Sequence, residues 1–366
     1  MRAAVIREQR ERHGRRIVAV LPVHYPKPLL TAMNVLAVEL WGPPGPPRGV
    51  DAGRVQPYVC AIVRNAFAFL ASGAASEVDA VLTPHTCDSL QGFATLVSDF
   101  SAWPKPLLHF QHPKGEDRQS LRTFLGRELR HLADGLAAVT GRELEPAALS
   151  KALALHRRID DARRFLLTRR RGFAGSDREL YTLLRRGEYL WPADHFRELE
   201  AALRTLQAQP TERGIPIMVS GYVCEPMGLF DVLNEAGAFV VADDYAGVGR
   251  RIPVETLAPA PDPWDALLAW VLSMPPCPTR AATQTARLEH LWRLYEESGA
   301  RALLIHTQKF CDPELFDVPA IRQRFAARDV PTLHLEGELE LAPSGQASTR
   351  LEAFVEMVQA RQWGSA

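Results

Sequence analysis

The stretch LLIHTQKFCDPELFDVP, residues 303–319, contains the local pattern from which the fold of the whole chain can be predicted. An apolar run ends at Thr307, and Cys311 follows shortly before a segment that begins Asp-Pro and has apolar residues at helical spacing. A strand followed by a helix is the repeating unit of parallel α/β sheets. No second cysteine lies within thirty residues of Cys311. Any partner of this thiol must therefore come from a distant part of the chain.

The same alternation of strands and helices occurs in residues 1–113 and again in residues 210–366. The predicted strands are 16–22, 78–84, 106–111, 215–221, 238–244, 301–307 and 331–337. The predicted helices between them are 55–72, 89–100, 225–236, 263–273, 281–298, 314–327 and 345–361. Short apolar strands separated by helices indicate parallel sheets that are covered on both faces. Residues 114–209 lack strand-like runs, so they are predicted to form an intervening helical block.

The composition is that of an ordinary globular protein with no bulk charge. Of the 366 residues, 46% are hydrophobic and 23% are charged, and Lys plus Arg equals Asp plus Glu at 43 each. This length favours roughly two domains. The neutral balance gives no electrostatic reason to expect nucleic acid or an anionic membrane as a partner. No apolar run reaches the ~20 residues of a membrane span, and the basic N-terminus is a poor signal peptide. We therefore expect a cytoplasmic protein.

Five cysteines occur, at positions 60, 87, 224, 277 and 311. Their odd number and the absence of a CxxC motif argue against a disulfide framework. Cys87 and Cys311 both follow a predicted strand and precede an aspartate placed to cap the next helix, and Cys60 lies near the start of the predicted helix 55–72. Ligands in parallel sheets bind beyond the carboxyl ends of the strands, and helix N-termini favour thiolates. The three thiols are therefore predicted to meet at the functional edge of the sheets.

Three thiolates at such an edge suit two kinds of metal centre. One is an iron–sulfur cluster with one iron open to a ligand from outside the protein. The other is a zinc site in which His85 or His306 supplies the fourth ligand. Cys224, which also follows a strand, could line the same cleft, whereas Cys277 lies in a Pro-Pro-Cys-Pro loop. A single buried cysteine is ordinarily inert, and spacing alone leaves both kinds of centre open.

Four segments, taken in order, resemble one known family. They are YVCAIVRNAF (58–67), VDAVLTPHTCDSL (78–90), KFCDPELFDVP (309–319) and GELELAPSGQASTRLEAFVEM (337–357). Together with EAGAFVVADDYAGVGR (235–250), they are similar to the 2-hydroxyacyl-CoA dehydratase and benzoyl-CoA reductase subunit family. The resemblance covers nearly the whole chain, and its length suits the smaller of the two subunits.

The resemblance implies an α/β fold with two flavodoxin-like (Rossmann-like) parallel-sheet domains and a [4Fe–4S] cluster held by Cys60, Cys87 and Cys311. It also implies a heterodimer with a homologous larger subunit and a separate ATP-hydrolysing iron–sulfur activator that delivers a low-potential electron. In the dehydratases that electron enters the thioester carbonyl of an acyl-CoA substrate, and the resulting ketyl radical anion expels the hydroxyl group. In the reductases it reduces the aromatic ring of benzoyl-CoA.

Three further residues are candidates for the surroundings of the cluster. Lys309 neighbours Cys311 and either stabilises a reduced cluster or faces water. Gln346 either hydrogen-bonds near the cluster or caps a helix. Arg350 either faces the site or pairs with a nearby glutamate. His85 and His306 are otherwise expected to support the site or to pack in the core.

Two departures from the family pattern keep other functions open. Leu30 occupies a position where relatives carry glutamate, which favours a non-catalytic electron-relay or scaffold subunit over one that binds the thioester. A homodimeric double-cubane-type reductase would need more than three cysteine ligands in each chain. Ala246 stands where such relatives often have a cysteine, and this disfavours that alternative.

Overall fold

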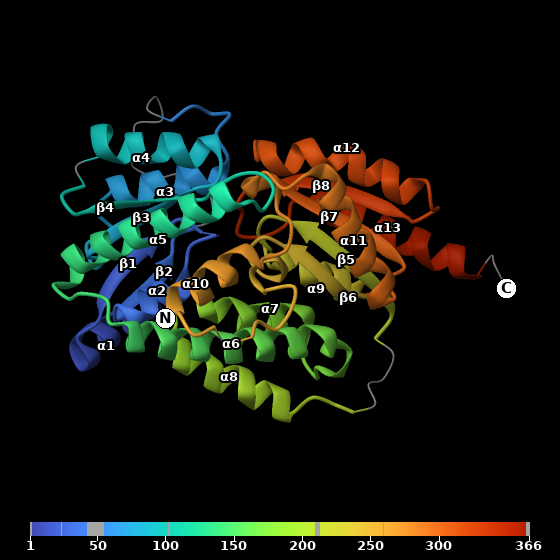
Figure 1. The fold of residues 1–366 in the computed structure, drawn as a ribbon. Helices are drawn as coiled ribbons and strands as arrows, with labels where there is room; N and C mark the ends of the chain where they lie inside the picture. The colour runs from blue at the N-terminus through green and yellow to red at the C-terminus, as the bar shows by residue number, and fades with distance from the viewer. Residues whose placement is uncertain are drawn as a thin grey trace.

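The computed structural model describes residues 2–22, 24–41, 55–101, 103–208, 213–258 and 260–363. It contains two four-stranded sheets in which every described pairing is parallel. The first sheet has the order β2-β1-β3-β4 and the second the order β6-β5-β7-β8. The prediction of an α/β protein with two parallel-sheet domains is confirmed, and both sheets share one strand order (Figure 1).

The strands of the first sheet are β1 (Arg16–Val20), β2 (Val35–Glu39), β3 (Ala80–His85) and β4 (Leu107–Gln111). Alternate side chains of β1 point to opposite faces. Ile17 and Ala19 pack with α3 (Ala61–Ala71) and α4 (Asp88–Phe100). Val18 and Val20 pack with α2 (Lys27–Ala32), α5 (Gln119–Thr140) and α10 (Pro263–Leu272) on the other face. Fully burying each branched side chain stabilises the sheet by about 1.5–3 kcal/mol.

The second sheet is built in the same way. Its strands are β5 (Ile215–Gly221), β6 (Ala238–Tyr245), β7 (Ala302–Gln308) and β8 (Thr332–Gly337). Ile217 and Val219 pack with α9 (Gly228–Glu235) and α13 (Gly345–Trp363). Met218 faces the other way, toward α11 (Gln284–Ser298) and α12 (Asp312–Ala326). Both faces are thus covered by helices, as a parallel sheet requires.

A layer of helices connects the two sheets. It contains α6 (Pro146–Thr168), α7 (Asp177–Arg185) and α8 (Pro192–Arg204), which lie below the sheets in Figure 1. Helix α6 contacts α2 and α10 beside the first sheet and β6 in the second. Helix α10 follows the second sheet's β6 in sequence but packs on α5 and α6. The boundary predicted between residues 209 and 210 falls outside the described residues, and the other domain limits remain predictions.

Two N-terminal helices and one strand were not expected from the sequence. They are α1 (Arg2–His13), α2 and β2. Strand β2 follows α2 after the short link Met33–Asn34, and no Gly or Pro separates the two elements. Asn34 makes the turn with a φ of 57°, in the left-handed region that asparagine tolerates. The run VLAVE is buried throughout, so it shows no alternation of polar and apolar residues.

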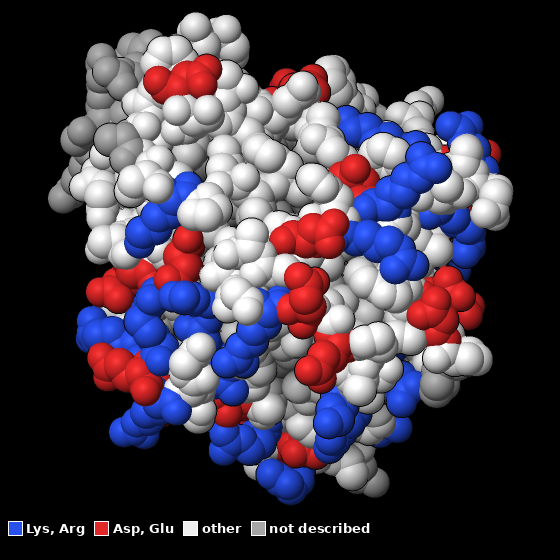
Figure 2. Space-filling view, turned by 60° about the vertical axis from the view of Figure 1, so that its left-hand side comes forward, with Lys and Arg blue, Asp and Glu red and all other residues white. Residues whose placement is uncertain are grey.

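The surface agrees with the neutral composition. Figure 2 shows acidic and basic side chains lying next to one another over much of one face. Among the described residues, no helix is both long and apolar enough to cross a bilayer.

Candidate functional site

The three predicted cluster cysteines occupy equivalent local positions. Cys60, Cys87 and Cys311 are the N-cap residues of α3, α4 and α12, respectively. Asp88 and Asp312 are therefore the first residues of their helices and not the caps that the sequence suggested. Cys87 and Cys311 each follow a strand that is third in its sheet's order, β3 in one and β7 in the other.

The two halves bring these cysteines into one apolar cluster. Cys60 and Cys311 are each 7% exposed and belong to the same buried group, against which the partly buried Cys87 packs. The thiols lie close enough to affect one another electrostatically. Burial raises the pKa of Cys87 to about 12, and Cys60 contributes to the rise. Burial also raises the pKa of Cys311 well above its usual range, with added contributions from Glu314, Cys60 and Cys87.

Backbone amides of the first helical turns act in the opposite direction. Burial raises the pKa of Cys60, and the amides of Ile62 and Val63 oppose this rise. The amides of Ser89 and Leu90 do the same for the pKa of Cys87. Burial is the larger effect at each site, so the neutral thiol is favoured in the chain alone, although the helix-terminal amides act toward the thiolate as expected. A bound metal cation is what normally deprotonates buried cysteine ligands.

Tyr222 and Cys277 are parts of this region that sequence reasoning missed. Burial raises the pKa of Tyr222 well above its usual range, and four thiols raise it further: Cys87, Cys311, Cys277 and Cys60. Cys277 is fully buried in the same apolar cluster. The ring of Trp41 stands edge-on to that of Tyr222, with 6.1 Å between the ring centroids.

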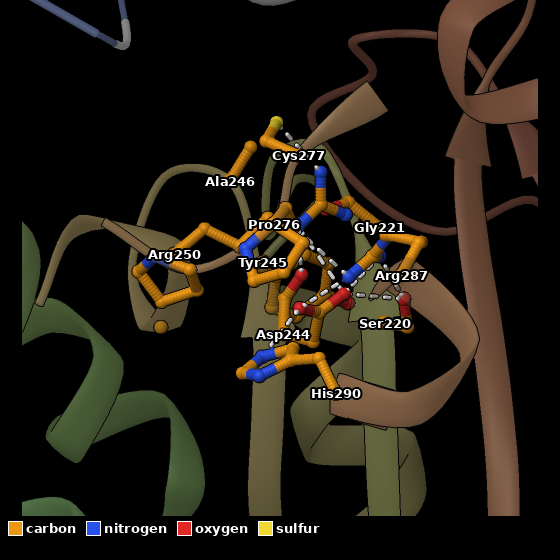
Figure 3. A network of polar contacts seen from close by, with 12 residues as sticks. Ser220, Gly221, Asp244, Tyr245, Ala246, Arg250, Pro276, Cys277, Arg287 and His290 are labelled. Atoms are coloured by element: carbon orange, nitrogen blue, oxygen red, sulfur yellow. Dashed lines mark hydrogen bonds and ion pairs between the residues drawn. The ribbon is translucent and has the colours of Figure 1, made fainter. Parts of the chain in front are cut away.

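A buried ionic network reaches the thiol of Cys277 (Figure 3). Arg250 is fully buried and donates to Glu314, with Nη2 2.9 Å from Oε2. Its Nε donates to the Asp244 carbonyl oxygen at 2.8 Å, and its Nη1 donates to Cys277 Sγ at 3.2 Å. Arg287 donates to Asp244 from the other side, with Nη1 2.7 Å from Oδ1. Although burial raises the pKa of Asp244, Arg250 and Arg287 bring it well below its usual range.

This network fixes the start of the helix that carries Cys311. Glu314 lies in the first turn of α12, and its backbone N–H donates to the Cys311 carbonyl oxygen at 3.0 Å. Arg250 also donates to the carbonyl oxygen of Gly221 at the end of β5. Cys311 is thereby held against the end of the second sheet. The signal in the sequence is Asp-Asp-Tyr-Ala-Gly-Val-Gly-Arg, residues 243–250, which forms part of the family resemblance but shows no structural role by itself.

The residue before Cys311 has a strained backbone. Phe310 has a φ of 61°, a region that costs about 1–2 kcal/mol for residues with a side chain. Flanking hydrogen bonds hold it there, from the Lys309 N–H to the Gly337 carbonyl at 2.8 Å and from the Cys311 N–H to the Gln308 carbonyl at 3.1 Å. Strain of this kind is often found at functional sites.

The structure does not bring the three supporting candidates to the thiols. Lys309, Gln346 and Arg350 are exposed. Arg350 Nη2 donates to the carbonyl oxygen of His334 at 2.9 Å, and no described hydrogen bond or ion pair connects any of the three to the thiols. Their proposed roles near a cluster remain predictions.

The residues of the zinc alternative have other partners. His85 Nδ1 is hydrogen-bonded to Gln111, and His306 Nδ1 lies 3.4 Å from the Tyr245 hydroxyl. Burial lowers the pKa of His306 to about 4, and His334 adds to the effect. Cys224 is buried in a different apolar cluster, which belongs to the second sheet.

The donor set is of the kind that iron–sulfur clusters use. Within the described ranges, no group of three or more His, Cys, Asp or Glu side chains is placed to hold one metal ion. A cubane cluster takes one thiolate on each iron and so needs thiols that are farther apart. Two buried thiols and one partly buried thiol from separate helix starts, in apolar surroundings, are the ligand type that such clusters use. The residues present therefore fit this cofactor.

Comparisons with known proteins agree with this arrangement. Residues 22–358 match the family described as 2-hydroxyglutaryl-CoA dehydratase, D-component. The chain is 25% identical to lactoyl-CoA dehydratase subunit beta of Anaerotignum propionicum, over 94% of this chain and 92% of that protein. It is 24% identical to (R)-2-hydroxyglutaryl-CoA dehydratase, subunit beta, of Acidaminococcus fermentans, with the same coverage. It is also 24% identical to a benzoyl-CoA reductase subunit from Thauera aromatica, over 87% of this chain and 84% of that protein. The family resemblance drawn from the motifs is confirmed.

Proposed function

The chain belongs to the family of the 2-hydroxyglutaryl-CoA dehydratase D-component, and we propose that it is the [4Fe–4S]-bearing subunit of a radical-type acyl-CoA dehydratase or benzoyl-CoA-type reductase. The observation that carries the proposal is the meeting of three N-cap cysteines, from both halves of the chain, in one apolar cluster. Relatives named as dehydratase and reductase subunits over nearly the whole length support it.

Cys60, Cys87 and Cys311 would hold the cluster in this proposal. When bound, such a cluster passes low-potential electrons toward a CoA thioester. The chain's own residues prepare the site. The apolar cluster around the thiols excludes water, and the ion pair between Arg250 and Glu314 fixes the start of α12.

The proposal includes two protein partners, a homologous larger subunit and an ATP-hydrolysing activator. Large exposed side chains next to the thiols support a docking surface there. Tyr58 is 64% exposed two residues before Cys60, and Phe316 is 78% exposed on the helix that Cys311 caps. Exposed aromatic groups are typical of the centres of protein interfaces. The proposal includes a cytoplasmic location, where the activator finds ATP.

A second candidate function is an electron-relay subunit that does not itself bind the thioester. The observation that favours it concerns Leu30, which stands where relatives have glutamate. Leu30 is buried on α2 in the core of the first sheet, so its position supplies neither an acid nor a base. The homodimeric double-cubane alternative is weaker, because Cys224 lies in a different cluster from the three N-cap thiols.

The test is anaerobic purification of the full chain, followed by iron, sulfide and zinc analysis with an absorption spectrum. The proposal expects about four irons and four sulfides per chain, with broad visible absorption. Zinc without iron, or a colourless protein after anaerobic reconstitution, would contradict it. Titration of the isolated chain with lactoyl-CoA and benzoyl-CoA then separates the two functions, because a relay subunit binds neither thioester.

A further inference from the structure

A second region of the molecule is a buried polar cavity beside the thiol region. It is a cavity of about 70 Å³ between the first sheet, the helical layer and the loop after β6. One water molecule needs about 10–15 Å³ of such space, so the cavity has room for several heavy atoms. None of the five cysteines lines it. Trp41 marks its border, since its ring contacts Arg251 of the cavity on one side and Tyr222 of the thiol region on the other.

Three cations meet at this cavity, and two of them share one ionised carboxylate. Lys27, Arg163 and Arg251 all line it. Glu39 lies 3.3 Å from Lys27 Nζ and 2.5 Å from Arg251 Nη1, measured at its Oε1. Burial raises the pKa of Glu39, but Arg251 and Lys27 bring it down to about 2, so this carboxylate is ionised. Burial lowers the pKa of Lys27, and both arginines lower it further. The three cations therefore repel one another.

The other acidic groups do not cancel this positive charge. Asp160 accepts from Trp270 Nε1 at 2.8 Å, and burial raises its pKa to about 6. Glu188 is paired with two cations outside the cavity lining, Arg2 at 2.9 Å and Arg185 at 2.7 Å. With Glu39 and Asp160 both ionised, Lys27, Arg163 and Arg251 exceed these two carboxylates by one positive charge. Asp243, which also acts on Arg163, is itself paired with Arg170 at 2.8 Å.

Arg250 also lines the cavity, but its charge is matched elsewhere. Its guanidinium pairs with Asp244 and Glu314. The buried histidines add no charge near neutral pH, because burial lowers the pKa values of His112, His156 and His195 to about 3.

Two of the cations carry N–H groups that no described residue accepts. They are Arg163 Nε and Arg251 Nη2, and both are buried. Apart from the ion pair of Arg251 with Glu39, the two arginines donate to backbone. Arg163 Nη2 lies 3.3 Å from the Val248 carbonyl oxygen, and Arg251 Nε lies 3.2 Å from the Ala246 carbonyl oxygen. The Nε2 atoms of His24 and His112, on the same cavity, also lack partners among the described residues. A buried donor without an acceptor costs about 1–3 kcal/mol.

Much of the rest of the lining is apolar. Ala37, Ile159 and Val271 come from three different elements and all line the cavity. A ligand that matches both parts of the lining has one negative charge, two acceptor oxygens and a short hydrocarbon end. Carboxylates accept charge-assisted hydrogen bonds from guanidinium groups in this way.

We propose that this cavity binds a small aliphatic monocarboxylate. Its carboxylate oxygens accept from Arg163 Nε and Arg251 Nη2, and its carbon chain lies against Ala37, Ile159 and Val271. The proposal does not depend on an iron–sulfur cluster or on the activity of the assembled enzyme.

The test uses the full chain and sodium propionate as the probe, by titration calorimetry at pH 7 and constant ionic strength. Propionamide is the uncharged analogue, and inorganic phosphate is the alternative anion. Propionate is expected to bind saturably at one site, while propionamide gives no saturable heat. Arg163→Gln is expected to weaken propionate binding at least tenfold. The matched control is Arg158→Gln on the same helix, whose side chain is 62% exposed, and its affinity is expected to stay within twofold of wild type.

Three results would overturn the proposal: no saturable binding of propionate, equal binding of propionamide, or unchanged affinity in Arg163→Gln. Tighter binding of phosphate would also overturn it, in favour of a different anion. A second measurement does not rely on a variant that folds. Crystals of the chain soaked in sodium propionate are expected to show its electron density at Arg163 and Arg251, with the carbon chain beside Ala37 and Ile159, and an empty cavity would contradict the assignment.

Discussion

The units β3–Cys87–α4 and β7–Cys311–α12 occupy the same place in the two sheets, yet they are anchored by different forces. At α12 the first turn is held by the buried pair of Arg250 and Glu314. At α4 the first residue, Asp88, is exposed, and the helix is held by the packing of Leu90 and other apolar side chains.

The difference shows two ways of positioning the same N-cap thiol. Apolar packing tolerates small shifts, because it has no preferred direction. A bidentate arginine–carboxylate pair has a defined geometry. If one partner is replaced, however, the other remains as an uncompensated buried charge, which is strongly destabilising. We therefore expect the second half to be the more vulnerable to a single substitution.

The largest expected effect comes from Arg250→Met. The change leaves Glu314 without its partner and removes one cation from Asp244, so the free energy of unfolding should fall by about 3–5 kcal/mol. Urea unfolding followed by circular dichroism measures it. The control is Arg322→Met. Arg322 is exposed on α12, the helix that carries Glu314, so the free energy of unfolding of this variant should stay within about 0.5 kcal/mol of wild type. Equal free energies of unfolding for the two variants would show that the Arg250–Glu314 pair does not anchor α12.

Next in size is Leu90→Ala in the apolar unit. Leu90 is 3% exposed, and its truncation should cost about 2–5 kcal/mol through lost burial and a residual cavity. Leu90→Met keeps the volume and should cost less than about 1.5 kcal/mol. If Leu90→Met were as damaging as Leu90→Ala in the same urea experiment, general apolar packing would not be the anchor of α4.

Mild acid should lower the free energy of unfolding through the buried histidines of the polar cavity and not through the ionic network. Burial lowers the pKa of His156 to about 3, below its unfolded value of about 6.5. The stability that depends on neutral His156 is therefore complete above pH 6.5 and is lost as the pH falls toward 3. At pH 5 the loss is about 2 kcal/mol.

The variant His156→Gln should escape that loss, so its stability should fall less than that of wild type between pH 7 and pH 5. Thr31 Oγ1, 2.9 Å from His156 Nε2, remains available to the glutamine amide. Parallel acid curves for the two proteins would show that His156 is not a source of acid sensitivity. Asp244 should not respond in this range, since its pKa lies well below it.

The smallest effect concerns the residues that precede the two thiols. Phe310→Gly relieves a positive φ at a gain of about 1–2 kcal/mol, partly offset by about 0.4–1 kcal/mol of added freedom in the unfolded chain. A net gain of roughly 0.5 kcal/mol is expected. Thr86 precedes Cys87 without a positive φ, so Thr86→Gly should lose about 0.5–1 kcal/mol instead. Thermal unfolding of both variants checks the opposite signs, and a shared sign would show that the backbone at Phe310 is not strained.

Much of the fold was predictable because it depends on local pattern. The strand before Cys311 and the helix after it follow from an apolar run, a cysteine and Asp-Pro, and the structure has both elements there. Strand β2 was missed because it is buried on both faces and follows a helix without a Gly or Pro signal.

The site was predictable only in part, since its other members meet through tertiary contacts. Nothing local in the sequence connects Arg250 to Glu314, which lies 64 residues away. The proline-rich loop of Cys277 gives no sign of a site, yet Cys277 is buried in the same cluster as Cys60 and Cys311. The helix-terminal amides lower the pKa values of the thiols as the sequence suggested, but burial, which a sequence does not display, raises them more strongly. The assignment of Cys60, Cys87 and Cys311 as cluster ligands stays a prediction.

The central claim is that both halves supply ligands to one centre, and iron content per chain tests it most directly. Cys87→Ala, Cys311→Ala and the control Cys224→Ala would be purified anaerobically beside wild type and analysed for iron and sulfide. The account predicts that either N-cap variant loses most of the iron, whichever half carries the change, while Cys224→Ala keeps the wild-type content. Full retention of iron in Cys311→Ala, with loss in Cys87→Ala, would contradict a centre shared between the two halves.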